Sequence, residues 1–313
     1  MSKKFRLVAD FGGTHARVGL SKSGKLYFPE KKRYQNNENV KKILCEYLLD
    51  KNVKLDSIRI SAAGPIKNDS VELTNSQLVI SSKELYKLFS INDIKLFNDA
   101  EAASHAIPYL EDKSLFILSK KENKHNTFGF ITLGTGLGVS GIKCLENNNI
   151  VISGEGGYSH LPTIKNDKIF SDAIMLINKS FTRISCERVI SGPGLELLFS
   201  ALIKTHGLNQ KNSNAEEIIN MALNDFKSLE FKTCIMILNL LGSFAATVTL
   251  IYGARGGMFL SGGLLQRMIP LVQYSNLTDN FYIEGRMKEY ISAIPLYIIN
   301  DDLISLKGCA FSP

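Results

Sequence analysis

The sequence has few cysteines, and no two of them lie close together. The five cysteines are an odd number spread along the chain without a Cys-x-x-Cys pair, which argues against a disulfide framework. We therefore expect reduced and mostly buried thiols. The N-terminal segment also lacks an apolar core of signal-peptide length followed by small residues. These features predict a cytoplasmic location.

The chain also lacks a concentrated basic surface, although its formal net charge is +7. Its lysines are scattered, and the densest basic runs, 31–33 and 120–121, are short and contain no interleaved aromatic residues. This pattern does not indicate a nucleic-acid-binding surface. We interpret the charge as solvated surface that adds a mild attraction for anionic ligands such as nucleotides.

One long apolar stretch, 234–254, contains no charged residue, but it includes polar and small residues such as Asn239, Gly242 and Thr247. We expect a buried core helix rather than a membrane span, and no membrane partner. The whole chain has 313 residues, of which 44% are hydrophobic and 21% are charged. That composition predicts a folded protein of about two domains.

Strands and helices alternate along the chain, which indicates the α/β class. The antiparallel first strand pair argues against a plain dinucleotide-binding domain, whose first strand leads directly into a helix. Ser81 with Glu84 resembles a capping box. We predict strands over 5–10, 16–20, 57–62, 93–97, 115–118, 128–133, 139–144 and 258–261, an extended segment over 71–80, and helices over 38–49, 81–88, 196–205 and 229–252.

Asn98 and Asp99 fall at the junction between a predicted strand and the helix that begins near Ala100. In open α/β sheets ligands bind outside the carboxyl ends of strands, and an Asp there can accept a proton from a substrate hydroxyl. The alternative is that Asp99 only caps the helix, which stabilises it by about 1 kcal/mol. Taken alone, the helix cap is the better interpretation.

Two glycine-rich turns each join a strand to a strand. The first is Asp10-Phe-Gly-Gly-Thr14 and the second is Gly134-Thr-Gly-Leu-Gly138. Glycine lets backbone amides approach an anion closely, so such turns can bind phosphate groups, and Asp10 could hold Mg²⁺ through water. For the first turn, an ordinary Gly-Gly hairpin is an equally good interpretation.

The chain carries seven distinctive segments, which are Asp10 to Thr14, Asn98-Asp99, Gly134 to Val139, Gly154 to Gly157, Glu187 to Gly194, Ser261 to Gly263 and Gly285 to Tyr290. In their order and spacing they resemble the bacterial glucokinase family, and the resemblance covers nearly the whole chain. It implies a two-domain ribonuclease-H-like (actin-like ATPase) sugar kinase fold with an interdomain cleft. The small domain would span 1–109, completed by 294–313, and the large domain 110–293.

The resemblance also implies roles for individual residues. Asp99 would be the catalytic base, and ATP with Mg²⁺ would be the cofactors, with Asp10 near the metal. The residues matching sugar ligands are Asn98, Asp99, Glu155 and Glu187, with Tyr158 at a further sugar position. The residues matching nucleotide ligands are Asp10, Gly12, Gly13 and Thr14 of the first phosphate loop, Gly134, Thr135 and Gly136 of the second, and Gly262 and Gly263 against adenosine.

The chain departs from the family pattern in several places. Tyr158 stands where the family usually has a sugar-binding His, His15 stands where an Asn is common, and Leu78 replaces an aromatic residue. The segment 301–308 lacks the small-residue turn that usually precedes the last helix. We expect these changes to alter sugar affinity or preference, or the final helix, without removing the proposed base.

These features predict an ATP-dependent glucokinase that converts glucose to glucose 6-phosphate in glycolysis. One alternative is a kinase for another hexose or for an amino sugar, which Tyr158 makes plausible. Another is a catalytically silent sugar sensor, against which the retained Asp99 and both glycine turns argue. A homodimer is compatible with the sequence.

Overall fold

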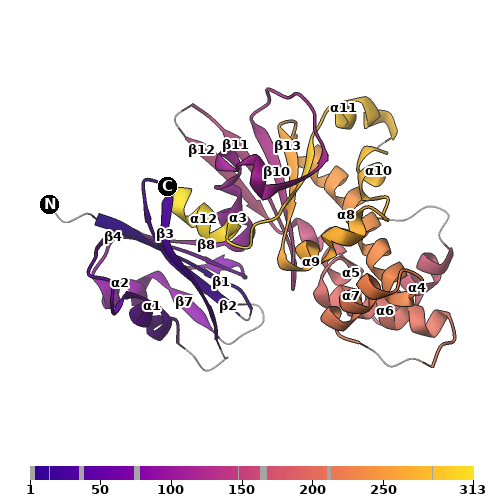
Figure 1. Ribbon diagram of the computed structural model, residues 1–313, viewed down its shortest axis with the longest axis horizontal. Helices are drawn as coiled ribbons and strands as arrows, with labels where there is room; N and C mark the ends of the chain where they lie inside the picture. Colours follow the sequence, from indigo (N-terminus) through magenta and orange to yellow (C-terminus); the bar gives the residue numbers. More distant parts are fainter. Residues whose placement is uncertain are drawn as a thin grey trace. The chain divides into compact units, whose positions relative to one another are not determined.

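The computed structural model describes residues 4–13, 15–34, 39–73, 78–146, 148–162, 168–209, 213–283 and 285–313. Two compact units are distinguished by their internal contacts (Figure 1). Unit 1 comprises residues 1–110 and 301–313, and unit 2 comprises residues 111–300.

In its described residues, unit 1 holds a five-stranded sheet in the order β3-β2-β1-β4-β8 and a small three-stranded sheet, β5-β6-β7. Strands β1, β4 and β8 run parallel, while β2 and β3 extend the sheet as antiparallel hairpins. The strands are β1 (Lys4–Phe11), β2 (His15–Lys22), β3 (Lys25–Arg33), β4 (Lys54–Ala62), β5 (Ile66–Lys67), β6 (Ser70–Glu72), β7 (Val79–Ser81) and β8 (Ile94–Asn98). The helices are α1 (Val40–Leu48), α2 (Ser82–Phe89), α3 (Asp99–Ser104), α12 (Ile304–Phe311) and the 3₁₀ turn η1 (Ile107–Tyr109).

The central strand β1 is buried on both faces, because successive side chains point to opposite sides of a sheet. Leu7 and Ala9 pack into the cluster that includes Ile43 and Leu44 of α1. Val8 packs instead with residues of α3 and α12, including Leu306. Figure 1 shows α1 and α2 on one side of this sheet and α3 and α12 on the other. The final helix therefore forms despite the unusual segment before it.

The structure corrects details of the predicted unit 1. Strand β3, an edge strand whose residues are mostly exposed, was not predicted from the sequence. Ser81 is the N-cap of α2, but its side chain makes no capping hydrogen bond, so the predicted capping box is wrong. The predicted first hairpin and the strands β4 and β8 are confirmed.

His105 follows α3 and is buried, with its ring edge-on to Phe97. Burial, assisted by the charge of Lys95, lowers the pKa of His105 to about 4. The unfolded chain takes up a proton below its ordinary pKa near 6.5, whereas the folded chain does not until about pH 4. Acidification from pH 7 to pH 5 should therefore reduce the free energy of unfolding by about 2 kcal/mol through this residue.

The His105→Gln variant, which cannot take up this proton, should lose that part of the pH dependence. Urea unfolding of both proteins at pH 7 and pH 5 measures it. If the stability of the variant falls with acidification as steeply as that of the parent chain, His105 is not the cause.

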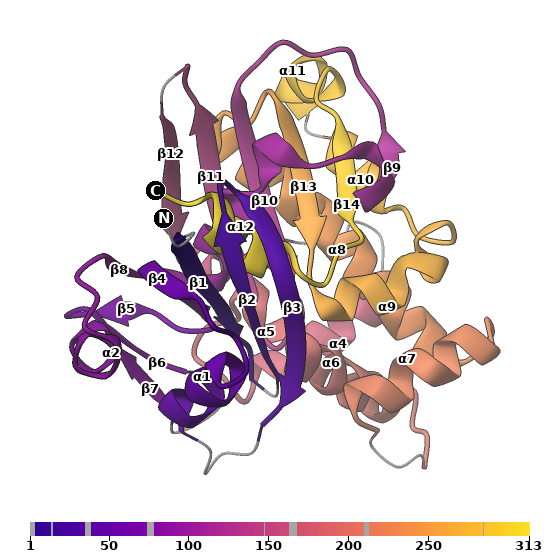
Figure 2. The same ribbon diagram turned by 60° about the vertical axis from the view of Figure 1, so that its left-hand side comes forward.

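In its described residues, unit 2 holds a six-stranded sheet in the order β12-β11-β10-β13-β14-β9 (Figure 2). Strands β10, β13 and β14 run parallel. The strands are β9 (Leu115–Ser119), β10 (Thr127–Leu133), β11 (Leu137–Cys144), β12 (Asn149–Gly154), β13 (Gly257–Ser261) and β14 (Leu296–Ile299). The helices are α4 (Lys168–Asn178), α5 (Cys186–Val189), α6 (Gly192–Thr205), α7 (Ala215–Asn224), α8 (Leu229–Tyr252), α9 (Gly263–Val272), α10 (Leu277–Tyr282) and α11 (Lys288–Ser292), with 3₁₀ turns η2 (Asp112–Ser114), η3 (Gly156–Tyr158) and η4 (Gly285–Met287).

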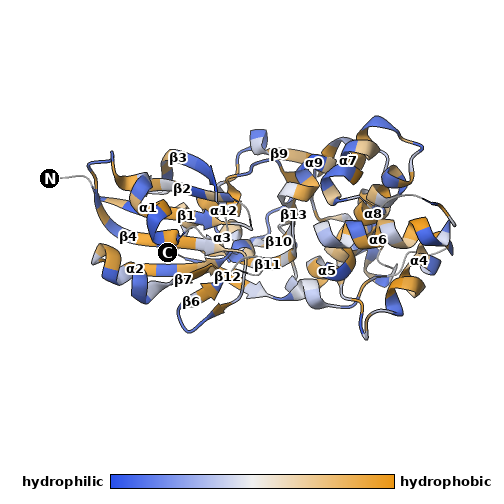
Figure 3. Ribbon diagram, turned by 90° about the horizontal axis from the view of Figure 1, so that it is seen from below, coloured by the Kyte–Doolittle hydropathy of each residue, from blue (hydrophilic) through white to orange (hydrophobic). Residues whose placement is uncertain are grey.

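Helix α8 lies in the hydrophobic core of unit 2, as predicted. By length and composition it could cross a membrane, but 67% of its most apolar window is buried inside the protein. It packs against α6, α7 and α10. In Figure 3, hydrophobic and hydrophilic residues alternate along α4 and α7, the pattern of helices that bury one face. The five cysteines are free, and Cys186, Cys234 and Cys309 are buried.

One prediction for unit 2 needs correction, and one strand was not predicted. The segment 294–313 was predicted to belong to the small domain, but β14 pairs with β13 and β9, so this segment joins unit 1 only from Asp301. Strand β12, which pairs with β11 at the edge of the sheet and is partly exposed, was not predicted. The predicted second glycine hairpin, between β10 and β11, is confirmed.

Candidate active site

The carboxyl ends of β1, β4 and β8 bring two predicted site residues to one edge of the unit 1 sheet. Asp10 lies beside Ser61 in the register of β1 and β4, and Ala62 lies beside Asn98 in the register of β4 and β8. Neighbouring strands are about 4.8 Å apart. The first glycine turn follows β1, and Asp99 follows β8, so both emerge at this edge.

Asp10 is buried, and both of its carboxylate oxygens contact side chains of unit 1. Its Oδ1 accepts a hydrogen bond from the Ser61 hydroxyl at 2.6 Å, and its Oδ2 pairs with the Arg17 guanidinium at 3.0 Å. Burial raises the pKa of the Asp10 carboxyl, and the Arg17 and Ser61 contacts oppose that shift. Arg17 stands opposite Asp10 in the β1–β2 register.

Asn98, rather than Asp99, is the N-cap residue of α3. Its Oδ1 accepts a hydrogen bond from the Ala100 N–H at 2.9 Å, and its Nδ2 donates to the Gly64 carbonyl at 3.3 Å. The Asp99 Oδ1 also accepts from the Ala100 N–H at 2.8 Å. Asp99 is half-buried and is the first helical residue. Because Asn98 already holds the capping position, the cap alone does not account for an aspartate at position 99.

The first glycine turn is closed by backbone and side-chain contacts. The Gly12 N–H donates to the His15 carbonyl at 3.0 Å, and the Tyr34 hydroxyl donates to the Gly12 carbonyl. Gly13 is half-buried. Thr14 lies outside the described residues.

The second glycine turn is held from both sides, by Glu187 of α5 and by Gly192, the first residue of α6. The Leu137 N–H donates to Glu187 Oε2 at 2.9 Å, and the Gly192 N–H donates to the Gly134 carbonyl at 2.8 Å. Within the turn, the Gly134 N–H donates to the Gly136 carbonyl at 3.0 Å. Thr135 is exposed at the tip.

Gly262 brings the end of β13 against the end of β10, directly before this turn. Its φ of +110° is in the region that favours glycine, and a Cβ there would overlap the backbone of Leu133. Gly134 and Gly263 differ, because a Cβ on either would meet no atom within 4 Å. Neither packing nor a positive φ requires glycine at these two positions. Both positions therefore have open space beside the backbone.

The sugar-ligand candidates of unit 2 lie near the same turn. Exposed Glu155 follows β12, and the next residues pass so close to β11 that a Cβ on Gly157 would overlap the Leu137 carbonyl oxygen. Tyr158 is 53% exposed, and its hydroxyl hydrogen bonds to Glu187. The charge of Glu187 raises the pKa of Tyr158, because a tyrosinate beside a carboxylate would be repelled. Unit 2 thus places candidate sugar acceptors beside a candidate phosphate loop.

A family model described as Glucokinase matches residues 7–312. This chain belongs to the glucokinase family. The glucokinase of Escherichia fergusonii is 29% identical over 308 residues, which are 97% of this chain and 95% of that protein. The crystal structure of a glucokinase from an Antarctic psychrotroph, 28% identical, superposes with a TM-score of 0.86 and covers 99% of this chain and 98% of that chain.

A more distant structural relative of this glucokinase-family chain is a ROK family glucokinase from Streptomyces griseus in complex with glucose and AMPPNP. It is 15% identical, has a TM-score of 0.65 and covers 98% of each chain. Such a low identity shows the shared fold alone. The predicted family and the predicted two-domain actin-like ATPase fold are confirmed.

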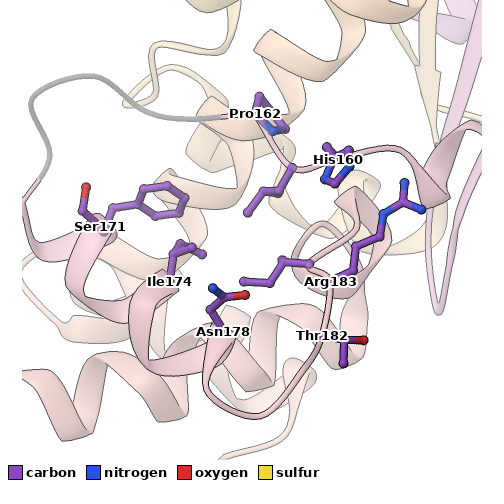
Figure 4. Close-up of a pocket in the computed structure, with 10 residues that line it drawn as sticks. His160, Pro162, Ser171, Ile174, Asn178, Thr182 and Arg183 are labelled. Atoms are coloured by element: carbon purple, nitrogen blue, oxygen red, sulfur yellow. The ribbon is translucent and has the colours of Figure 1, made fainter.

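A cavity of about 560 Å³ is lined by residues of α4 and of the segments 160–162 and 182–184. Figure 4 shows Ile174 projecting from α4 toward the segment of Pro162. The lining is mostly apolar around Phe170 and Ile174 and contains none of the glucokinase-family site residues named above. Its lining residues are His160, Leu161, Pro162, Phe170, Ser171, Ile174, Asn178, Thr182, Arg183 and Ile184.

Sequence reasoning did not identify several groups that hold the glucokinase-family residues in place. These are Ser61 and Arg17 beside Asp10, the Leu137 N–H beside Glu187, and Arg183, whose guanidinium donates to the Tyr158 carbonyl at 2.7 Å. Only Arg17 had a usable signal, because the predicted hairpin brings the start of its second strand opposite residue 10, and the observed register pairs Asp10 with Arg17. A backbone N–H carries no sequence signal.

Proposed function

We propose that this protein transfers the γ-phosphoryl group of ATP to the primary hydroxyl at carbon 6 of glucose. The observation that carries the proposal is the position of Asp99 on the same edge of the unit 1 sheet as the first glycine turn. Membership of the glucokinase family supports glucose as the acceptor. The complex of the Streptomyces griseus relative with AMPPNP, an ATP analogue, supports ATP as the donor.

In this proposal, Asp99 accepts the proton of the attacking hydroxyl, and positioning with charge stabilisation supplies most of the remaining rate enhancement. Asn98, Glu155, Tyr158 and Glu187 bind the other sugar hydroxyls. Carboxylate acceptors form strong hydrogen bonds, and a sugar that lacks the matching hydroxyl leaves them unpaired.

The nucleotide is bound by backbone groups of both glycine turns and the end of β13. Their amides stabilise the phosphates, and glycine lets the ligand approach the backbone. The proposed nucleotide residues are Asp10, Gly12, Gly13, Thr14, Gly134, Thr135, Gly136, Gly262 and Gly263.

A magnesium ion fits this donor set only as a partly hydrated ion. Among the described residues, no group of three or more His, Cys, Asp or Glu side chains is placed to hold a metal. Mg²⁺ keeps several waters and commonly uses one or two carboxylates with substrate phosphates. Asp10 already binds Ser61 and Arg17, so it would hold the ion through water, where the ion neutralises phosphate charge. The cytoplasmic location and the homodimer remain predictions from the sequence.

Coupled ADP release tests the substrate proposal. The purified protein is assayed with Mg·ATP and glucose, fructose, mannose, galactose or glucosamine in turn. We expect the highest kcat/KM with glucose. A higher kcat/KM with another sugar would make that sugar the proposed substrate. Sugar binding without turnover of any of them would favour the silent sensor.

Gly134→Ala should weaken ATP binding without destabilising the fold. The added methyl group points into open space, so it removes no packing, but it occupies the space proposed for the phosphates. We expect KM for ATP to rise about tenfold, equivalent to about 1.4 kcal/mol, with little change in the thermal midpoint. An unchanged KM for ATP would show that the phosphates do not bind beside Gly134.

A further inference from the structure

Glu187 contacts two groups to which different functions are assigned above. Its Oε2 accepts a hydrogen bond from the backbone N–H of Leu137, the residue that ends the second glycine turn. Its carboxylate also accepts a hydrogen bond from the Tyr158 hydroxyl. One charged group therefore joins a sugar-ligand candidate to the backbone of a phosphate loop.

A movement of the Glu187 carboxylate would displace the second glycine turn. A Cβ on Gly136 would lie 2.8 Å from Glu187 Oε2, so the carboxylate lies directly against the turn. At the other end of the turn, the Gly192 N–H donates a hydrogen bond to the Gly134 carbonyl at 2.8 Å. Val189 and Ile190, between Glu187 and Gly192, are fully buried. The segment that contacts both ends of the turn is thus anchored in the core.

We propose that Glu187 is a positioning residue for the second glycine turn and that it couples sugar binding to phosphate binding. This inference rests on the proposed function, because it takes Glu187 as a sugar acceptor. A sugar that hydrogen bonds to the carboxylate fixes its orientation, and the fixed Oε2 holds the Leu137 N–H and the turn in one arrangement. Such coupling is reciprocal, so a bound nucleotide strengthens sugar binding by the same factor.

Tyr158 has a defined part in this arrangement. Before sugar binds, its hydroxyl donates to Glu187, while the Arg183 guanidinium holds its backbone carbonyl at 2.7 Å. Tyr158 therefore keeps the carboxylate directed toward the turn. The Tyr158→Phe variant, which lacks the hydroxyl, should show weaker ADP binding in the absence of sugar.

Calorimetric titration with Mg·ADP, with and without glucose, tests the coupling. Glu187→Ala should weaken ADP binding about tenfold or more even without sugar, since a hydrogen bond to a charged group is lost. Glu187→Gln retains an oxygen that accepts from the Leu137 N–H, so it should restore most ADP affinity while glucose binding stays weak. Glu155→Ala, the matched control, should weaken glucose binding alone.

Gly136→Ala provides a second test if Glu187→Ala does not fold. Its added methyl group displaces the carboxylate, so both ADP and glucose should bind more weakly. The proposal is overturned if Glu187→Ala binds ADP as the parent chain does, if folded Glu187→Gln fails to restore ADP binding, or if Gly136→Ala leaves glucose binding intact. ADP binding that follows the expected pattern in a protein without sugar turnover would contradict the proposed function while supporting the positioning of the turn.

Discussion

Replacing Asp99 with asparagine should lower kcat by about 10²–10⁴-fold, the usual contribution of a positioned general base. Asparagine has nearly the same size, and its side-chain oxygen can still accept from the Ala100 N–H, as Asp99 Oδ1 does at 2.8 Å. The helix start and the fold should therefore persist. KM for glucose should change by less than about threefold, because the amide still hydrogen bonds to a hydroxyl. Steady-state kinetics and glucose titration measure both quantities.

Glu101→Gln is a suitable control for this variant, because it also neutralises a carboxylate in α3, two residues further along. We expect it to retain most of the turnover. Near-normal turnover of Asp99→Asn, or an equal loss in both variants, would remove Asp99 from the role of base.

Gly308→Ala should destabilise unit 1 by about 3 kcal/mol, the upper end of the usual cost of overpacking. Helices α12 and α3 pack so closely here that a Cβ on Gly308 would overlap the carbonyl oxygen of Ala102. The backbone must therefore shift, and α3 begins with Asp99. We expect a lower thermal midpoint together with a lower kcat, measured by calorimetry and by the coupled assay.

Gly207→Ala separates this steric effect from the cost of replacing a glycine. Gly207 has a φ of +63°, and a Cβ there would meet no atom within 4 Å. Its replacement therefore reduces the free energy of unfolding only by the strain of an alanine in the left-handed conformation, about 1–2 kcal/mol. It should leave kcat unchanged. If Gly308→Ala proves no more destabilising than Gly207→Ala, the close packing of α12 on α3 does not hold in solution.

Both glycine hairpins were predictable because their signals are local. A strand of alternating side chains, a glycine turn and a second such strand determine the pairing of β1 with β2 and of β10 with β11. The long helix α8 was equally clear, since it is apolar on nearly all sides and buried. In these elements, residues close in sequence determine the structure.

The edges of the sheets were not predictable in the same way. Strands β3 and β12 bury few side chains, so their sequences show weak alternation. The strand β14 joins the sheet of unit 2 by pairing with β13 and β9, a contact between distant segments that local patterns do not reveal. The start of the C-terminal part of the small domain was therefore predicted at residue 294, whereas unit 1 resumes at Asp301.

The candidate site was predicted mainly through the family resemblance. Asp99 alone looked like a helix cap, and only the structure shows that Asn98 holds that position. Glu187 received a role only through the family resemblance, and nothing in the sequence around it indicates that its Oε2 accepts from the Leu137 N–H. Side-chain chemistry could be predicted from the sequence, but contacts to backbone atoms could not.

The identity of the reaction product tests the central claim most directly. The protein is incubated with glucose and Mg·ATP, and the sugar product is identified by phosphorus and proton nuclear magnetic resonance, with 6-deoxyglucose as the control substrate. We expect glucose 6-phosphate and ADP in equal amounts, and no phosphorylated product from 6-deoxyglucose. A phosphate on another hydroxyl, or ADP formed without a phosphorylated sugar, would contradict it.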